Sequence, residues 1–74
     1  MKRKKNRDLE KIYPKGQFIA KLRRLADTLE AGKNFSIQIS GERIFVPQSA
    51  GVNIEHEREG NLEEVEFQIK WMRR

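Results

Sequence analysis

The chain has 74 residues, of which 36% are hydrophobic and 36% are charged, and its formal net charge is +5. This length allows one domain, and the lack of cysteine excludes a disulfide framework, a thiolate zinc site and a cysteine nucleophile. No stretch approaches the ~20 apolar residues of a membrane span, and no apolar segment follows the basic start as in a secretory signal. We therefore expect a soluble, cytoplasmic protein without membrane contact.

The basic residues are concentrated at the start of the chain. Residues 1–24 hold ten basic and two acidic side chains, whereas residues 25–74 hold six basic and nine acidic ones. Residues 1–12 carry too few apolar groups to offset the entropy of ordering, which predicts a disordered basic arm. Residues 13–74 are then the single folded domain.

A helix is predicted from about residue 15 to 31. Its apolar stripe at helical spacing consists of Phe18, Ile19, Leu22, Leu25, Ala26 and Leu29. Pro14 suits the start of a helix because its missing N–H costs nothing there. Gly32 suits the left-handed position just after the helix end.

Two hairpins follow, because the apolar period changes from helical to alternating after Gly32. In the first, a type II′ turn at Gly41-Glu42 would set Ile39 opposite Ile44 and Ile37 opposite Val46. Pro47 ends this hairpin, and residues 47–51 form a loop.

In the second hairpin, a glycine-first turn at Gly60-Asn61 defines the register. The inner pairs are then His56 with Val65, Ile54 with Phe67, and Val52 with Ile69. The outer face pairs Glu55 with Glu66 and Glu57 with Glu64.

These elements predict a two-layer α+β fold with one amphipathic helix packed on a four-stranded antiparallel sheet built from two hairpins. The helix stripe covers the apolar face of the sheet, because neither surface can bury itself alone.

Three pieces of the chain have a familiar order and spacing, namely residues 22–32 (LRRLADTLEAG), residues 40–47 (SGERIFVP) and residues 65–71 (VEFQIKW). By these pieces, residues 17–71 resemble the amphi-Trp domain, a small prokaryotic family of uncharacterised function. The resemblance implies a small soluble domain and no known activity, ligand or catalytic residue. The basic arm lies outside the shared pattern.

The acidic face of the second hairpin is the first candidate contact surface. It consists of Glu55, Glu57, Glu64 and Glu66. Like charges opposite each other on paired strands reduce stability, so we interpret this face as a surface for a basic partner, and an edge strand as an alternative protein-binding site. A solvated face without a role remains open. Four glutamates on an open face lack the enclosure that hard cations favour, so no metal is expected.

The basic residues at the start of the chain support a rival function, nonspecific nucleic-acid binding. Residues of the arm and the helix that would contact phosphates are Lys2, Arg3, Lys4, Lys5, Arg7, Lys11, Lys21, Arg23 and Arg24. A solubilising tail is the alternative interpretation.

Catalysis is not expected, because the one histidine, His56, has no nucleophile partner and no cofactor motif is present. His56 is predicted to be a partly buried side chain at the sheet end. Trp71 is predicted to be structural, closing the small core beside the helix. The chain is thus expected to be a non-enzymatic binding module without cofactors, a monomer or weak homodimer whose partner is an unknown protein or a nucleic acid.

Overall fold

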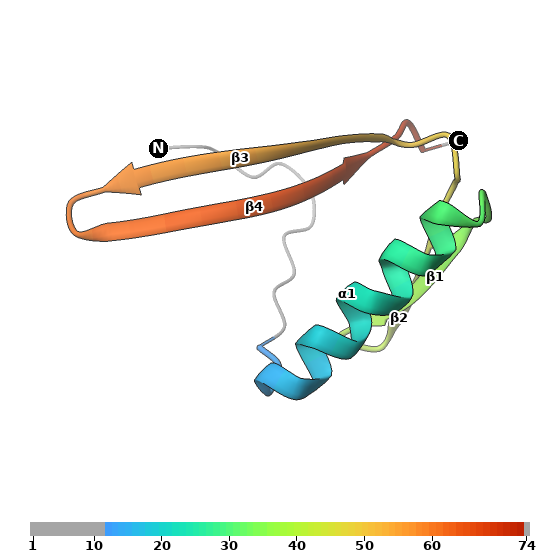
Figure 1. Cartoon of the computed structure of the whole chain (residues 1–74), viewed down its shortest axis with the longest axis horizontal. Coiled ribbons are helices and arrows are strands. Elements are labelled where there is room, and N and C mark those ends of the chain that lie inside the picture. The colour runs from blue at the N-terminus through green and yellow to red at the C-terminus, as the bar shows by residue number, and fades with distance from the viewer. Residues whose placement is uncertain (1–11, 74) are drawn as a thin grey trace.

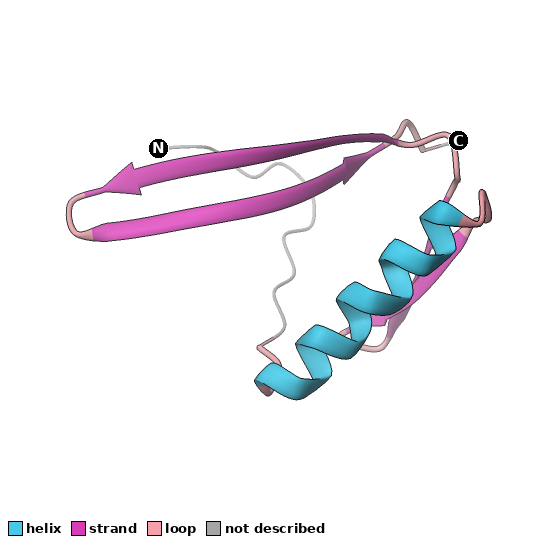
Figure 2. Cartoon of the chain, in the orientation of Figure 1, coloured by secondary structure: helices cyan, strands magenta, loops and turns pink. Residues whose placement is uncertain are grey.

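The computed structural model describes residues 12–73 as one helix followed by two antiparallel hairpins (Figure 1). The elements are α1 (Lys15–Glu30), β1 (Phe35–Ile39), β2 (Glu42–Val46), β3 (Gly51–Glu59) and β4 (Leu62–Lys70). Figure 2 shows helix α1 in cyan and the strands of the two hairpins in magenta. The predicted α+β class and all five predicted elements are confirmed. The arm, apart from Ile12, lies outside the described residues.

Helix α1 begins and ends where its sequence predicts. Pro14 precedes its first residue, and its carbonyl accepts a 3.0 Å hydrogen bond from the N–H of Phe18. At the other end, Gly32 has φ +69°, and the N–H groups of Gly32 and Lys33 donate to the carbonyls of Leu29 and Thr28. This pair of bonds is a Schellman cap, which satisfies two carbonyls that the helix leaves free.

The first hairpin differs from the predicted register by two residues. The observed pairs are Ile37 with Ile44 and Phe35 with Val46, so the predicted pairs of Ile39 with Ile44 and Ile37 with Val46 are wrong. The turn is Ser40-Gly41, where both residues have positive φ, +50° and +82°. Two successive positive φ angles are typical of a type I′ turn, which matches the twist of the strands. A shift of two residues leaves every side chain on its predicted face.

The second hairpin has the predicted register throughout. His56 pairs with Val65, Ile54 with Phe67, and Glu55 with Glu66. Of the two turn residues, Gly60 alone has a positive φ, +61°, as the glycine-first turn requires.

The prediction of a single four-stranded sheet is only approximate, because the strands form two separate two-stranded sheets, β1–β2 and β3–β4. The loop between them begins at Pro47, whose carbonyl accepts a hydrogen bond from the N–H of Ala50. The N–H of Gln48 donates to the side-chain oxygen of Asn34 at 2.9 Å, which ties this loop to the segment between α1 and β1. The chain therefore leaves the first hairpin in a new direction, and β3 does not pair with β2. Figure 1 shows the two parts diverging from this loop.

The buried core of residues 12–73 is consequently small. Helix α1 packs on β1, and only Phe35 and Val46 are buried. The expectation that the helix stripe covers the apolar faces of both hairpins is wrong for the second one. Phe18, Ile19 and Leu22 of the stripe remain exposed, because no strand of β3–β4 reaches them.

We predict that Phe35→Ala lowers the free energy of unfolding by about 3 kcal/mol or more, because it empties the centre of the core. Phe35 is 4% exposed, whereas Phe45 on the same hairpin is 68% exposed. Phe45→Ala is therefore the matched control, with an expected change below about 1 kcal/mol. Urea unfolding followed by the fluorescence of Trp71, the one tryptophan, measures both. Equal effects of the two variants would contradict this assignment of the core.

Candidate functional site

The β3–β4 hairpin is the candidate interaction site, because it stands apart from the other elements. Within the part of the chain that the structure describes, α1 contacts β1 of the first hairpin, whereas β3 and β4 contact only each other. Isolated two-stranded hairpins are at best marginally stable in water. A hairpin with two nine-residue strands and no neighbouring element is therefore expected to gain stability when a partner binds it.

One face of this hairpin is apolar and exposed. Val52, Ile54, Val65 and Phe67 are each between 62% and 69% exposed. They lie on the same face because the register pairs Ile54 with Phe67, and side chains alternate along each strand. We call these four residues the apolar hairpin face. The alternating sequence predicts this apolar face, but its predicted place in the core is wrong, since the pattern of a strand does not reveal whether a helix covers it.

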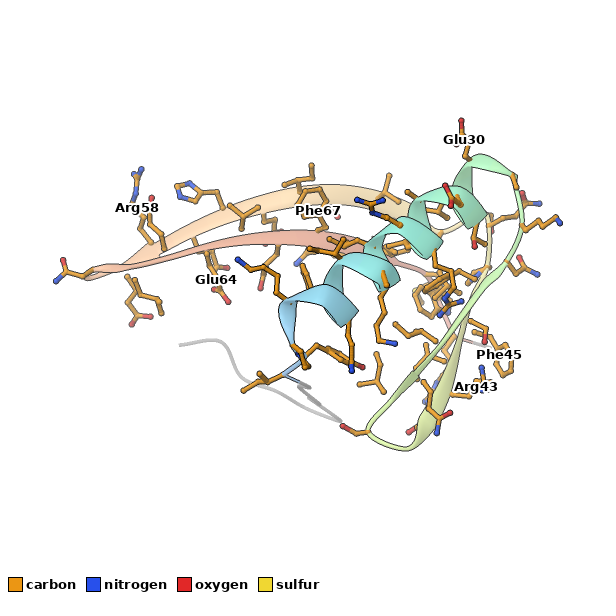
Figure 3. All side chains as sticks on the ribbon, turned by 60° about the horizontal axis from the view of Figure 1, so that its bottom comes forward. Glu30, Arg43, Phe45, Arg58, Glu64 and Phe67 are labelled. Carbon is orange, nitrogen blue, oxygen red and sulfur yellow. The ribbon has the colours of Figure 1, made fainter. Side chains whose placement is uncertain are left out.

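The opposite face holds the predicted acidic residues. Figure 3 shows Glu64 and Phe67 projecting from opposite sides of the hairpin. The carboxylate oxygens of Glu55, Glu57 and Glu66 lie within 4.8 Å of one another. Glu66 also accepts a 3.2 Å hydrogen bond from the amide of Gln68. The structure thus brings three of the four predicted glutamates together, and Glu64 lies opposite Glu57 on the same face.

None of these four glutamates forms an ion pair with another described residue. Their mutual repulsion is therefore not offset by a cation from residues 12–73. The face is open, with Glu57 exposed and Glu55 and Glu66 half-buried. An open arrangement of this kind lacks the enclosed oxygen shell that calcium and magnesium favour.

A polar cluster lies near the turn, on the same side of the hairpin as the apolar hairpin face. The guanidinium of Arg58 donates to Glu63 at 2.6 Å, and a ring nitrogen of His56 lies 3.0 Å from the same carboxylate oxygen. The Arg58 guanidinium, and after it His56, hold the pKa of Glu63 below its ordinary value of 4.5. The side chain of His56 is 47% exposed, so the prediction of a partly buried histidine at the sheet end is wrong, because no other element of residues 12–73 covers this end of the hairpin.

The basic residues of α1 are only partly available to a phosphate. The ammonium group of Lys21 lies 5.2 Å from the centre of the Tyr13 ring, and the guanidinium of Arg24 lies 4.5 Å from the centre of the Phe35 ring. Both contacts are cation–π interactions that hold the side chains along the protein. Arg23 is exposed. The predicted contacts at Lys2, Arg3, Lys4, Lys5, Arg7 and Lys11 lie outside the described residues.

Trp71 follows directly after β4 and is 37% exposed. It lines an open groove of about 1100 Å³ together with Ile39, Ile44 and Phe45 of the first hairpin and with Met72. The structure therefore brings Trp71 toward the first hairpin, and its structural role stays a prediction. Among residues 12–73 no helix has the length and apolar character to cross a membrane.

Comparison with models of known protein families, with curated proteins and with solved structures found no match. The resemblance to the amphi-Trp domain therefore stays a prediction from the sequence.

We predict that Arg58→Gln raises the pKa of Glu63 toward its ordinary value, because the strongest hydrogen bond to the carboxylate is lost. With its pKa lowered in the folded state, Glu63 stabilises the hairpin above pH 4.5, and this contribution disappears as the pH falls through the lowered pKa. An NMR titration of the Glu63 carboxyl carbon measures the shift. Arg43→Gln on the first hairpin is the control, and an unchanged Glu63 pKa in Arg58→Gln would refute the assignment.

Proposed function

We propose that this chain is a small non-enzymatic interaction module whose contact element is the β3–β4 hairpin. The observation that supports the proposal most is that this hairpin contacts no other element within residues 12–73 and keeps its apolar hairpin face exposed and its acidic face open. The helix and the first hairpin form the platform from which it projects (Figure 1). The acidic face or a free strand edge would receive the partner protein.

The chemistry of the acidic face favours a basic segment. Arginine side chains bind carboxylates through two parallel hydrogen bonds, and such charge-assisted bonds are stronger than neutral ones. Three carboxylates within 4.8 Å of one another would share the donors of one or two arginines, which would relieve their mutual repulsion. A free strand edge adds a second mode, in which an extended peptide pairs with the backbone.

The test is the binding of a fluorescent arginine-rich peptide to the full chain, measured by anisotropy at low salt. We predict that the triple variant E55Q/E57Q/E66Q weakens binding at least about tenfold, because charge-assisted hydrogen bonds are lost. The matched control is D27N/E30Q/E42Q, which removes the same number of acidic groups from the helix and the first hairpin and is expected to leave affinity within about threefold.

The two variants have the same net charge, so a nonspecific electrostatic effect would weaken binding equally in both. Equal loss would therefore contradict a role for the acidic face. Binding that survives in E55Q/E57Q/E66Q would assign the contact to a strand edge, and a chain that binds no basic peptide at low salt would refute the acidic face as the site.

Nucleic-acid binding through the arm and α1 is the second candidate, and the observation that favours it is the charge of residues 1–24, ten basic against two acidic side chains. Each phosphate that a basic side chain neutralises releases counterions, so log affinity falls linearly with log salt. We predict that a chain lacking residues 1–12 shows a flatter salt slope than the full chain when titrated with duplex or single-stranded DNA. Equal slopes would remove the arm from any nucleic-acid contact.

A further inference from the structure

An open groove runs along the outer edge of β2. The consecutive residues 42–45 of this strand line one wall, and residues 69–73 line the other. Consecutive side chains of a strand point to opposite faces of its sheet. A groove that all four strand residues border therefore follows the edge of β2 and not one of its faces. Its volume of about 1100 Å³ is sufficient for a segment of another molecule.

The edge of β2 that borders this groove has backbone groups without a strand partner. Within residues 12–73, β2 pairs only with β1. The residues on either side of the two-residue turn form a hydrogen-bonded pair, and bonded and non-bonded pairs then alternate along the hairpin. The N–H and C=O groups of Ile44 consequently point toward Ile37 of β1, whereas those of Arg43 and Phe45 point outward to the groove. Such an edge can pair with a further strand.

Most charged side chains of the groove are basic. The charged residues among those that line it are Arg43, Lys70, Arg73 and Glu42. None of the three basic groups forms an ion pair with another described residue. The guanidinium of Arg43 donates at 2.8 Å to the neutral hydroxyl oxygen of Ser36, which leaves its charge uncompensated. A ligand with negative charge therefore complements this groove.

The alternation of side chains along β2 indicates which groups an added strand would carry. Figure 3 shows Arg43 and Phe45 on the side of the first hairpin that faces away from α1. Ile44 lies on the opposite side, which it shares with the buried Val46. An added strand would place its own side chains beside these on the same two faces. Acidic side chains would then lie next to Arg43, and apolar ones next to Ile44.

Two other occupants fit these observations less well. Residues 1–11 of this chain carry six basic and two acidic side chains, so they would bring like charge to the basic groups of the groove. A single-stranded nucleic acid carries negative charge, and its bases could stack on Trp71. It has no row of alternating N–H and C=O groups to pair with Arg43 and Phe45. An extended acidic peptide supplies both the charge and the backbone pairing.

We infer that an extended peptide with alternating acidic and apolar side chains binds beside β2 and lengthens the first sheet by one strand. Its backbone pairs with Arg43 and Phe45, and its acidic side chains lie near the three basic groups of the groove. Trp71 and Met72 add apolar surface on the opposite wall. This site is separate from the acidic face of the β3–β4 hairpin and takes a ligand of the opposite charge, so it does not depend on the proposed function.

The first experiment is amide hydrogen exchange of the full chain, with and without a saturating short peptide that alternates glutamate and valine. The amides of Arg43 and Phe45 should exchange at least about tenfold more slowly with the peptide, because each gains a backbone hydrogen bond. The amides of Ser36 and Gln38 point outward from the other edge of the same hairpin. They are the internal control, with an expected change below about twofold.

The second experiment measures the affinity of the same peptide, labelled with fluorescein, by anisotropy. Phe45→Pro removes an N–H that faces the groove, and we expect it to weaken binding at least about tenfold. Phe45→Val keeps that N–H and should weaken binding less. Gln38→Pro removes an outward N–H from the opposite edge of the hairpin and should leave affinity within about threefold.

A charge-matched pair of variants tests the basic groups of the groove. K70Q/R73Q should weaken binding of the acidic peptide at least about fivefold, because it removes two of the three positive charges that line the site. R23Q/K33Q removes the same charge from exposed positions outside the groove and should leave affinity within about twofold.

Three results would overturn the inference. One is the absence of peptide binding at low salt, and another is a bound peptide that leaves the Arg43 and Phe45 amides as fast as before. The third is an equal loss in K70Q/R73Q and R23Q/K33Q, which would reduce the attraction to net charge. Single-stranded DNA is titrated in parallel, and a change in Trp71 fluorescence with DNA but not with the peptide would assign the groove to nucleic acid instead.

Discussion

The β3–β4 hairpin exposes an apolar face that no other element of residues 12–73 covers. The small size of the core and the candidate interaction surface both depend on this exposure. Alternating apolar residues give a pair of strands one apolar face, which stabilises the fold where another element covers it. Here the helix covers the first hairpin, and Phe35 and Val46 are buried. The second hairpin receives no such cover, because the loop after Pro47 directs it away.

The small core and the exposed interaction surface therefore have the same cause, since the second hairpin does not pack on the helix. A chain of this length supplies only a few kcal/mol of stability from its own core. Apolar surface left outside that core lowers the stability of the single chain and at the same time provides the driving force for association. The net charge of −4 on residues 51–70 lies on the side of the acidic face, opposite the apolar hairpin face.

The sequence predicted every helix and strand, because its periodicities and turn residues are local signals. It also predicted which faces are apolar and acidic, including the pair Glu55 and Glu66. It did not predict the turn at Ser40-Gly41, because serine rarely adopts a positive φ and the glycine-first alternative gave the same faces. The sequence also did not predict that the strands form two separate sheets. That separation depends on long-range contacts such as Gln48 with Asn34, which leave no periodic signal in the sequence.

Hydrogen exchange of the backbone amides tests the central claim most directly, because it reports how much each hairpin is protected from opening. If no element of residues 12–73 covers the apolar hairpin face, the amides of β3 and β4 around Ile54 and Phe67 exchange fast in dilute solution. The amides of β1 and β2 exchange more slowly, since α1 packs on β1 and both Phe35 and Val46 are buried. Protection of β3–β4 equal to that of β1–β2 in dilute solution would contradict the claim.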